Sequence, residues 1–318
     1  MLSRLVKPRS LALIGGTGVG IGYLVNNNEY VSHLGIVRFA RAGLTASKMI
    51  VDYKITMRGD PGSEEYQQRM HLCHLRGANR ILELCRNNGG VFIKVGQHVA
   101  SLQYLLPEEY ISVLGVLHSK APSSDIIEIK KVFVDTTGRE LEDVFEYFNP
   151  EPCGAASLAQ VHEARLKSGE RVAVKIQHPK VRDRSVMDVA TMELFARIAD
   201  YLFSDFKLMW LVDETKKNLP KELDFIHEAK NAEKVRELFK HMDFLEVPKI
   251  YLDLCSEKVL TMQFCEGCQI SDVDYFRTNN IDTHDVCRKI GRLYSEMIFK
   301  DGYVHCDPHP GNIMDFIR

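Results

Sequence analysis

One segment of alternating residues constrains the fold of this 318-residue chain more than any other. Residues 156–177 read ASLAQVHEARLKSGERVAVKIQ, and apolar Val172, Val174 and Ile176 occupy every second position near the end of the segment. Alternation with a period of two indicates a half-buried strand, and a Ser-Gly pair between two such runs is typical of a tight turn. The segment therefore predicts a β-hairpin.

A long helical region precedes this hairpin. From Tyr30 to about Lys120 the sequence has long stretches without proline, and in residues 63–90 Ser63 is a helix start signal while Gly89-Gly90 is a stop signal. No strand pattern occurs before this region ends. The first part of the chain is therefore expected to be helical.

Helices and strands alternate around and after the hairpin. Helices are expected over about 125–134 and about 185–203. A third helix is expected to begin at Pro220, because proline lacks a backbone N–H and the N–H of a first helical residue would have no partner within the helix. The runs VPKIYLD and KVLTMQF then read as two short strands. These elements together predict an α+β fold.

Composition excludes several classes of protein. Apolar residues make up 45% and charged residues 26%, which does not fit a disordered chain, a collagen-like rod or a polytopic membrane protein. The 41 basic and 43 acidic residues give a net charge of −2, so no general positive field favours nucleic acid. The eight cysteines form no dense framework, which favours reduced thiols, as in an intracellular compartment, over a disulfide scaffold.

The first 29 residues look like a targeting or anchoring segment. They carry Arg4, Lys7 and Arg9 but no acidic residue before Glu29, and the uncharged residues 10–28 would span about 28 Å as a helix. Mitochondrial targeting, with or without retention as an anchor, is the favoured interpretation; a secretory signal and a single membrane helix are the alternatives. The glycines here do not meet the G-x-G-x-x-G spacing of dinucleotide-binding loops.

The segment VHCDPHPGN at 304–312 carries the sharpest chemical pattern. His305, Asp307 and Asn312 match the H-x-D-x-x-x-x-N spacing of a kinase catalytic loop. In that pattern the carboxylate faces a hydroxyl group or a water, and the amide holds a magnesium ion. Such a spacing also occurs by chance in loops.

A second pattern centres on Lys175, which ends VAVK in the second strand of the hairpin. A lysine inside a sheet needs an anionic partner, and nucleotide phosphates together with a helix carboxylate would supply it. Downstream, ELDFIHEAKNAE offers Glu222, Asp224 and Glu228, of which the last two would share one helical face. Solvated surface charges explain each of these residues singly, but their order along the chain follows that of a kinase.

These motifs together resemble the aarF-domain-containing, UbiB-type atypical kinases. The resemblance rests on FIKVGQ, GAASLAQVHEA, VAVKIQHP, the ELDFIHEAKNAE block and HCDPHPGN, and it runs from about Tyr30 to Asn312. It implies a protein-kinase-like fold with a helical N-terminal extension. It also implies that the K-x-G-Q segment, here Lys94 to Gln97, folds across the active site, and that an alanine-rich turn, Ala155, Ala156 and Ser157, replaces the glycine-rich loop.

The resemblance also implies a role for each matching residue. Lys175 would contact the α- and β-phosphates and Glu228 would hold that lysine. Glu222 and Asp224 would face Lys94. Backbone groups near Gln263 to Cys265 would bind adenine. Asp307 would be the catalytic carboxylate, and Asn312 would bind the metal ion. The implied ligands are ATP or ADP with Mg²⁺, and the implied setting is a mitochondrial membrane, with a lipid, a quinone-related molecule or a protein as acceptor.

The expected domain organisation is a segment over 1–29, a helical extension over 30–150, a kinase-like N-lobe over 151–267, and an incomplete C-lobe over 268–318. Asp315-Phe316 is followed by Ile317 and lies close behind Asn312, so it does not match the second metal-binding aspartate of a kinase. A truncated, inactive product is therefore expected as one possibility. The alternative function is a non-catalytic, membrane-associated scaffold or pseudokinase.

Two further alternatives rank lower. A small-molecule phosphotransferase of the aminoglycoside-kinase type shares the H-x-D-x-x-x-x-N spacing but does not explain K-x-G-Q. A zinc site built from Cys265, Cys268, Cys306, His305 and His309 lacks a second C-x-x-C pair.

Overall fold

The computed structural model describes residues 35–118, 123–203, 207–307 and 312–315. The chain forms two compact units that alternate along the sequence. The helical unit contains the described residues up to Ser123, with Ala155–Leu158 and His178–Pro220. The sheet unit contains Ser124–Gly154, Ala159–Gln177 and the described residues from Lys221 onward. The predicted boundaries at 150 and 267 stay predictions, and the segment 1–29 lies outside the described residues.

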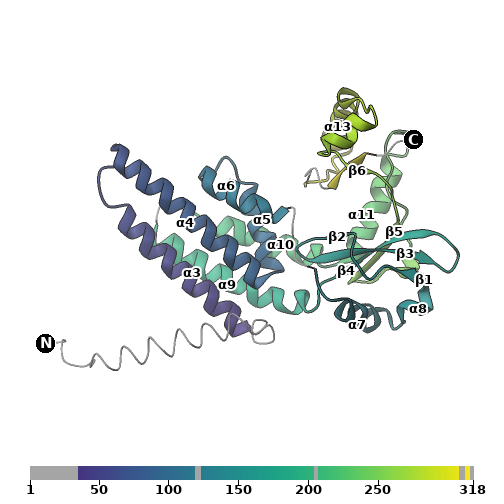
Figure 1. Ribbon diagram of the computed structural model, residues 1–318, viewed down its shortest axis with the longest axis horizontal. Helices are drawn as coiled ribbons and strands as arrows, with labels where there is room; N and C mark the ends of the chain where they lie inside the picture. The colour runs from purple at the N-terminus through teal and green to yellow at the C-terminus, as the bar shows by residue number, and fades with distance from the viewer. Residues whose placement is uncertain (1–34, 119–122, 204–206, 308–311, 316–318) are drawn as a thin grey trace. The chain divides into compact units, whose positions relative to one another are not determined.

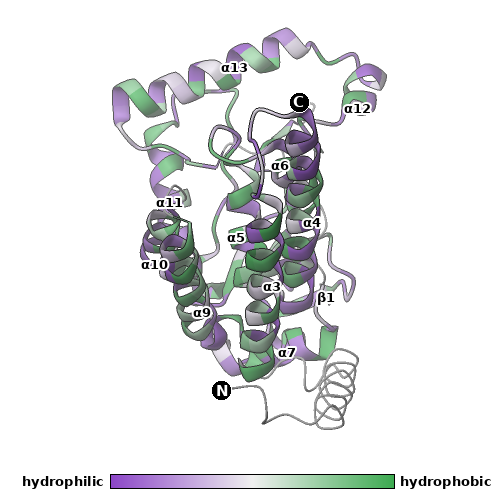
Figure 2. Cartoon of the chain, turned by 90° about the vertical axis from the view of Figure 1, so that its left-hand side faces the viewer, coloured by the Kyte–Doolittle hydropathy of each residue, from purple (hydrophilic) through white to green (hydrophobic). Residues whose placement is uncertain are grey.

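The described part of the helical unit contains seven helices. They are α3 (Gly35–Thr56), α4 (Glu64–Asn88), α5 (Val91–Ala100), α6 (Glu108–Leu114), a 3₁₀ helix (Gly115–His118), α9 (Val181–Leu202) and α10 (Met209–Glu222), whose last two residues belong to the sheet unit. Helix α3 packs against both α4 and α9 (Figure 1). Hydrophobic residues recur along these helices between hydrophilic ones, as expected for helices that bury one face (Figure 2).

The predicted signals of α4 are confirmed. The Ser63 side chain accepts a hydrogen bond from the backbone N–H of Tyr66, which satisfies one of the free N–H groups at the helix start. The helix ends at Asn88, and Gly89 follows with a φ of 65°, a left-handed value that favours glycine.

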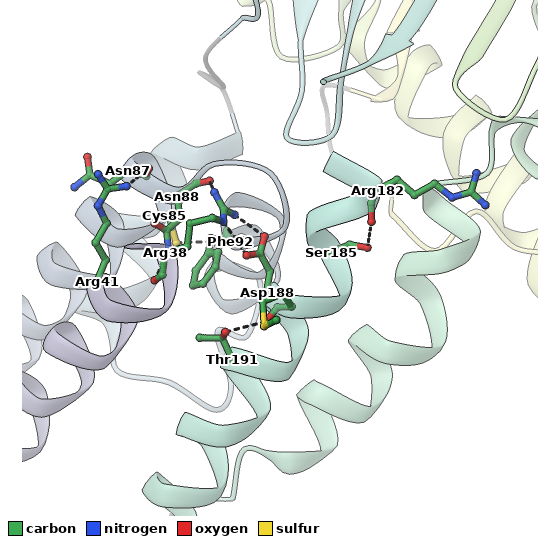
Figure 3. Close-up of polar contacts among 11 residues, drawn as sticks. Arg38, Arg41, Cys85, Asn87, Asn88, Phe92, Arg182, Ser185, Asp188 and Thr191 are labelled. Atoms are coloured by element: carbon green, nitrogen blue, oxygen red, sulfur yellow. Dashed lines mark hydrogen bonds and ion pairs between the residues drawn. The ribbon is translucent and has the colours of Figure 1, made fainter. Parts of the chain in front are cut away.

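A buried ion pair joins α3 to α9. Arg38 Nε donates to Asp188 Oδ1 at 2.8 Å, Arg38 also donates to the carbonyl oxygen of Asn88, and its guanidinium lies 5.5 Å from the ring centre of Phe92 (Figure 3). Both charged residues are 4% or less exposed. A charge buried this deeply is tolerated only when it is paired and hydrogen-bonded, so the pair fixes how the two helices meet.

The sheet unit contains an antiparallel sheet in the order β1 (Phe145–Phe148), β3 (Ala159–Leu166), β4 (Arg171–Gln177) and β5 (Val259–Gln263). Strands β3 and β4 form the predicted hairpin, so that prediction is confirmed. The two-residue strand β2 (Gly154–Ala155) precedes β3.

The two faces of this sheet are covered by different helices. Helices α7 (Ile126–Thr137) and α8 (Leu141–Val144) cover one face, where Ile129 and Phe133 pack with Val172, Val174 and Ile176 of β4. Helix α11 (Phe225–Leu238) covers the other face through Phe225 and Ala229 (Figure 1). The period-two alternation of β4 therefore directs Lys175 toward α11.

The remaining elements of the sheet unit follow β5. They are β6 (Cys268–Gln269), α12 (Val273–Thr278), α13 (Thr283–Glu296), a π-helical turn (Met297–Asp301) and β7 (Met314–Asp315). Strands β6 and β7 pair antiparallel, with Asp315 opposite Cys268.

Two sequence predictions about local structure are wrong. Pro220 does not open a helix but lies in the last turn of α10, where Val212, Thr215 and Leu219 are buried, so packing outweighs the preference of proline for a first turn. The run VPKIYLD forms only an isolated bridge between Ile250 and Met262, followed by a 3₁₀ helix (Leu252–Leu254). It lies beside the edge strand β5, and its proline has no N–H to extend the pairing.

Among the described residues, no helix is both long and apolar enough to cross a membrane. All eight cysteines are free thiols in the structure.

Candidate functional site

Lys175 and Glu228 form the central ion pair of the sheet unit. Lys175 Nζ lies 2.7 Å from Glu228 Oε1 and 2.8 Å from Oε2, so the ammonium donates to both carboxylate oxygens. It also lies 4.7 Å from the ring centre of Phe225. The Lys175 side chain is 24% exposed and that of Glu228 is 42% exposed, so both groups remain partly open to solvent and to a ligand.

The fold explains how two residues so far apart in sequence meet. Lys175 lies in the middle of the sheet, opposite Val161 of β3 and Leu260 of β5. Helix α11 starts at Phe225, so Glu228 lies in its first turn, above the face from which Lys175 projects. The sequence analysis did not predict the contact between the Lys175 ammonium and Phe225. The signal available for it was Asp224 directly before Phe225, because an aspartate commonly caps a helix start.

The E-x-D residues lie where α10 ends and α11 begins. Asp224 is the N-cap of α11, four positions before Glu228, and it accepts hydrogen bonds from the N–H groups of Ile226 at 3.0 Å and His227 at 3.4 Å. Glu222 is the last residue of α10. A capping aspartate satisfies free N–H groups and places its charge at the positive end of the helix dipole.

The K-x-G-Q residues lie on α5 in the helical unit. Gln97 Nε2 donates to the carbonyl oxygen of Leu117 at 2.9 Å. A Cβ atom at Gly96 would lie 2.5 Å from Leu117 Cδ1 and 3.0 Å from Cys85 Sγ, so only glycine fits there without rearrangement. Lys94 belongs to the helical unit and Glu222 to the sheet unit, so the contact expected between them stays a prediction.

The alanine-rich turn leads from β2 toward β3. Ala155 is half-buried, Ala156 is exposed and Ser157 is buried. His178 Nε2 lies 2.9 Å from the carbonyl oxygen of Ala156, and burial lowers the pKa of His178. The neutral His178 ring can donate its Nε2–H to the Ala156 carbonyl oxygen and so hold the turn in place. Ala156 itself remains exposed to solvent.

The proposed adenine-binding segment follows the end of β5. Gln263 donates its backbone N–H to the carbonyl oxygen of Lys249 at 2.8 Å, and its side-chain amide donates to Glu246 Oε1 at 3.1 Å. Burial, followed by the charge of Glu246, raises the pKa of the Cys265 thiol. Cys265 is therefore held in its neutral form.

The two described ends of the catalytic-loop motif lie together. Asn312 Nδ2 donates to Asp307 Oδ2 and to the Asp307 carbonyl oxygen, both at 3.1 Å. The backbone N–H of Asp307 donates to His305 Nδ1 at 3.3 Å. Burial and the negative charge of Asp307 raise the pKa of nearby Tyr294. The motif thus presents an exposed carboxylate with an amide at its side.

The oxygen atoms of Asp307 and Asn312 are suitable ligands for a magnesium ion that also binds phosphate oxygens. No group of three or more histidine, cysteine, aspartate or glutamate residues suited to a metal occurs in the described part of the chain. Asp307 and Asn312 supply one carboxylate and one amide, and Mg²⁺ in phosphate-transfer sites is held by one or two protein groups together with substrate oxygens. The zinc alternative at Cys265, Cys268, Cys306, His305 and His309 stays untested, because His309 lies outside the described residues.

The structure forms two separate pairs, Lys175 with Glu228 and Asp307 with Asn312, both in the sheet unit. No hydrogen bond joins one pair to the other among the described atoms. Their joint action on one nucleotide therefore stays a prediction.

Comparison with known proteins assigns the domain. Residues 116–315 match the ABC1 atypical kinase-like domain. The chain is 50% identical over 312 residues to AarF domain-containing protein kinase 1 of Mus musculus, covering 96% of this chain and 59% of that protein. It is 46% identical over 307 residues to AarF domain-containing kinase 1 of Drosophila melanogaster, covering 94% and 59%. This chain thus spans 59% of the length of either relative.

A solved structure has a similar fold. The Mycobacterium tuberculosis protein Rv3197, determined in complex with erythromycin, matches with a TM-score of 0.51 and 26% identity. The match covers 78% of this chain and 63% of that protein. The predicted α+β, kinase-like fold class is confirmed by this match and by the domain match.

Proposed function

Because this chain belongs to the ABC1 atypical kinase-like family, we propose that it binds ATP or ADP with Mg²⁺ and hydrolyses ATP or transfers its γ-phosphate. The Lys175–Glu228 pair carries the proposal, because a sheet lysine held by a carboxylate in the first turn of a helix is the arrangement that kinases use to position nucleotide phosphates.

The proposed chemistry assigns each pair a step. Glu228 positions the ammonium of Lys175, which binds the α- and β-phosphates. The carboxylate of Asp307 accepts the proton of the attacking hydroxyl group or water. The oxygen of that hydroxyl group or water bonds to the γ-phosphorus as the bond between the γ-phosphorus and the ADP oxygen breaks. Asn312 would hold Mg²⁺ together with phosphate oxygens, and the bound ion would shield their negative charge.

The other nucleotide contacts are proposed from the family resemblance. The turn at Ala155 and Ala156 would lie over the phosphates, and backbone near Gln263 and Cys265 would meet the adenine. Lys94 would approach Glu222 and Asp224 and regulate access to the site.

The first test measures nucleotide binding by thermal shift with ATP and Mg²⁺, on this chain and on Lys175→Ala. The variant is expected to lose the shift. Lys167→Ala, which changes an exposed lysine of the hairpin connection, is the matched control and should keep it. Equal shifts for both variants, or no shift for the unchanged chain, would contradict the nucleotide site.

A non-catalytic role is the second candidate. Asp315 lies on β7, immediately behind the catalytic-loop motif and paired with β6, which is not the hairpin setting of the second metal-binding aspartate in kinases. Magnesium-dependent ATP hydrolysis separates the candidates. Binding with hydrolysis supports an enzyme, and binding without hydrolysis supports a pseudokinase or scaffold.

We also propose a mitochondrial location at a membrane, with a lipid, a quinone-related molecule or a protein as acceptor. The basic, acid-poor residues 1–29 and the family resemblance support the location. Fractionation of cells that express the chain with and without residues 1–29 tests it. Equal distribution of the two forms would contradict targeting by this segment.

A further inference from the structure

The helical unit contains a large apolar cavity whose lining includes neither Lys175 nor Glu228. Its volume is about 790 Å³, and it is partly open to solvent. Side chains from α3, α4, α5, α6, α9 and α10 line it, among them Met49, Ile50, Leu84, Phe92, Phe195 and Val212. Protein interiors are normally close-packed, and cavities of several hundred Å³ lined by apolar groups are typical of ligand sites.

The cavity extends along α3. Its lining residues on this helix run from Ala42 to Lys54, a distance of roughly 18 Å at 1.5 Å per residue. An acyl chain in one membrane leaflet spans about 15 Å, half the thickness of the hydrocarbon layer. One extended chain with a small head group therefore fits along α3.

One end of the cavity carries a cluster of polar side chains. Tyr53 Oη lies 2.7 Å from His74 Nδ1 and 2.8 Å from Tyr110 Oη, and all three residues line the cavity. Burial lowers the pKa of His74, and it raises the pKa of Tyr110 to about 12. The three groups are therefore uncharged near neutral pH, and they can rearrange their hydrogen bonds around a ligand oxygen.

The surrounding charges disfavour an anionic head group. Glu109 is paired with His71 and lies close enough to His74 to affect its pKa. Lys54 also lines this end, but its ammonium donates to the carbonyl oxygen of Leu202 at 2.7 Å and lies 4.6 Å from the ring centre of Phe203. A carboxylate placed against the three neutral groups would lie near the negative charge of Glu109, and the Lys54 ammonium is already held by the Leu202 carbonyl oxygen and the Phe203 ring.

We propose that this cavity binds a single-chain amphiphile whose uncharged head group hydrogen-bonds to the Tyr53, His74 and Tyr110 cluster while its chain lies along α3. The site is separate from the nucleotide site and does not depend on the proposed phosphate chemistry.

The only tryptophan of the chain, Trp210, supplies the readout. It precedes Leu211 and Val212 of α10, which line the cavity. Titration of the full chain with 1-dodecanol should give a saturable change in tryptophan fluorescence. Dodecanoate, with the same chain but a charged head group, should bind at least tenfold more weakly. Absence of saturable binding, or equal affinity for both probes, would overturn the proposal.

Variants localise the binding. Ala199→Phe fills the cavity from α9 and should reduce dodecanol affinity at least tenfold, whereas Ala190→Phe on the exposed side of the same helix should leave affinity unchanged. Ala46→Leu fills the cavity from α3 and provides a second test if Ala199→Phe does not fold. Unchanged binding in a folded filling variant, or an equal loss in Ala190→Phe, would refute the assignment.

Two more variants separate head-group recognition from the nucleotide site. Tyr53→Phe removes the hydroxyl shared by His74 and Tyr110 and should weaken dodecanol binding severalfold, with little effect on dodecanoate. Lys175→Ala should bind dodecanol as the unchanged chain does, even if it fails to bind ATP. Equal weakening of both probes by Tyr53→Phe would contradict the head-group assignment, and loss of dodecanol binding in a folded Lys175→Ala would contradict a separate site.

Discussion

Lys175 and Glu228 meet across the interface of β4 and α11, with the ammonium within 2.8 Å of both carboxylate oxygens. The two contacts from one carboxylate hold the lysine side chain in a single orientation. Preorganisation of this kind lowers the cost of placing a charged group against a ligand.

Glu228→Gln should therefore impair ATP turnover by misplacing Lys175. We expect a loss of about 10- to 100-fold in hydrolysis, because small displacements of a positioning group have effects of that size. Glu237→Gln, on the same helix but paired only with nearby Lys240, is the control and should behave as the unchanged chain. Steady-state hydrolysis with varied ATP measures both. Equal rates in the two variants would remove Glu228 from the site.

Asp307→Asn should separate binding from chemistry. Loss of a general base lowers rates by about 10² to 10⁴-fold, while binding through Lys175 should persist. Thermal shift with ATP and Mg²⁺, compared with hydrolysis, measures the two effects. Asp285→Asn on α13, whose carboxylate pairs with Lys289, is the control. If Asp307→Asn abolishes binding as well, its carboxylate serves the metal rather than the proton.

Gly96→Ala should destabilise the helical unit. The new methyl group would lie 2.5 Å from Leu117 Cδ1, and overpacking of this kind costs about 1–3 kcal/mol. Gly115→Ala is the control, because no atom lies within 4 Å of the Cβ position there. Chemical denaturation measures both variants. Leu117→Ala combined with Gly96→Ala should recover part of the loss, and a simple sum of the two single effects would argue against the clash.

Asp52 should make folding stability fall in acid. Hydrogen bonds from Arg76, opposed by burial and aided by Arg80, lower the pKa of Asp52 to about 2. A depressed carboxyl pKa contributes stability that is present above the unfolded value of about 4 and is lost as the pH falls toward 2. The contribution should be about 1 kcal/mol, because the half-exposed Arg76 is screened by solvent. Asp52→Asn should flatten the stability profile between pH 4 and 2, and an unchanged slope would contradict this role.

Local chemistry determined which parts of the structure were predictable. Ser63 and Gly89 act on groups within four residues, and the alternation around Lys175 depends only on the geometry of a strand, so all three were visible in the sequence. Pro220 was misassigned because tertiary packing decided where α10 ends. The predicted helix start at Pro220 lies before Asp224, which caps the actual start of α11 at Phe225.

Two long-range groupings carried no signal in the sequence, unlike the Lys175–Glu228 pair that the family resemblance implied. Arg38 and Asp188 are 150 positions apart and carry no shared pattern. The cluster of Tyr53, His74 and Tyr110 joins three helices, and its members read individually as ordinary helix residues. Only the packing of α3 against its neighbours brings these groups together.

The ten-residue helix α5 holds Lys94 two positions before Gly96, and that proximity affects how defects in this segment should be interpreted. A bulky side chain at position 96 would displace helix α5 from Leu117, and Lys94 would move with the helix. A substitution at Gly96 could therefore have the same effect on turnover as a substitution of Lys94. Lost turnover in such a variant would report a displaced helix and not a direct role of position 96 in the reaction.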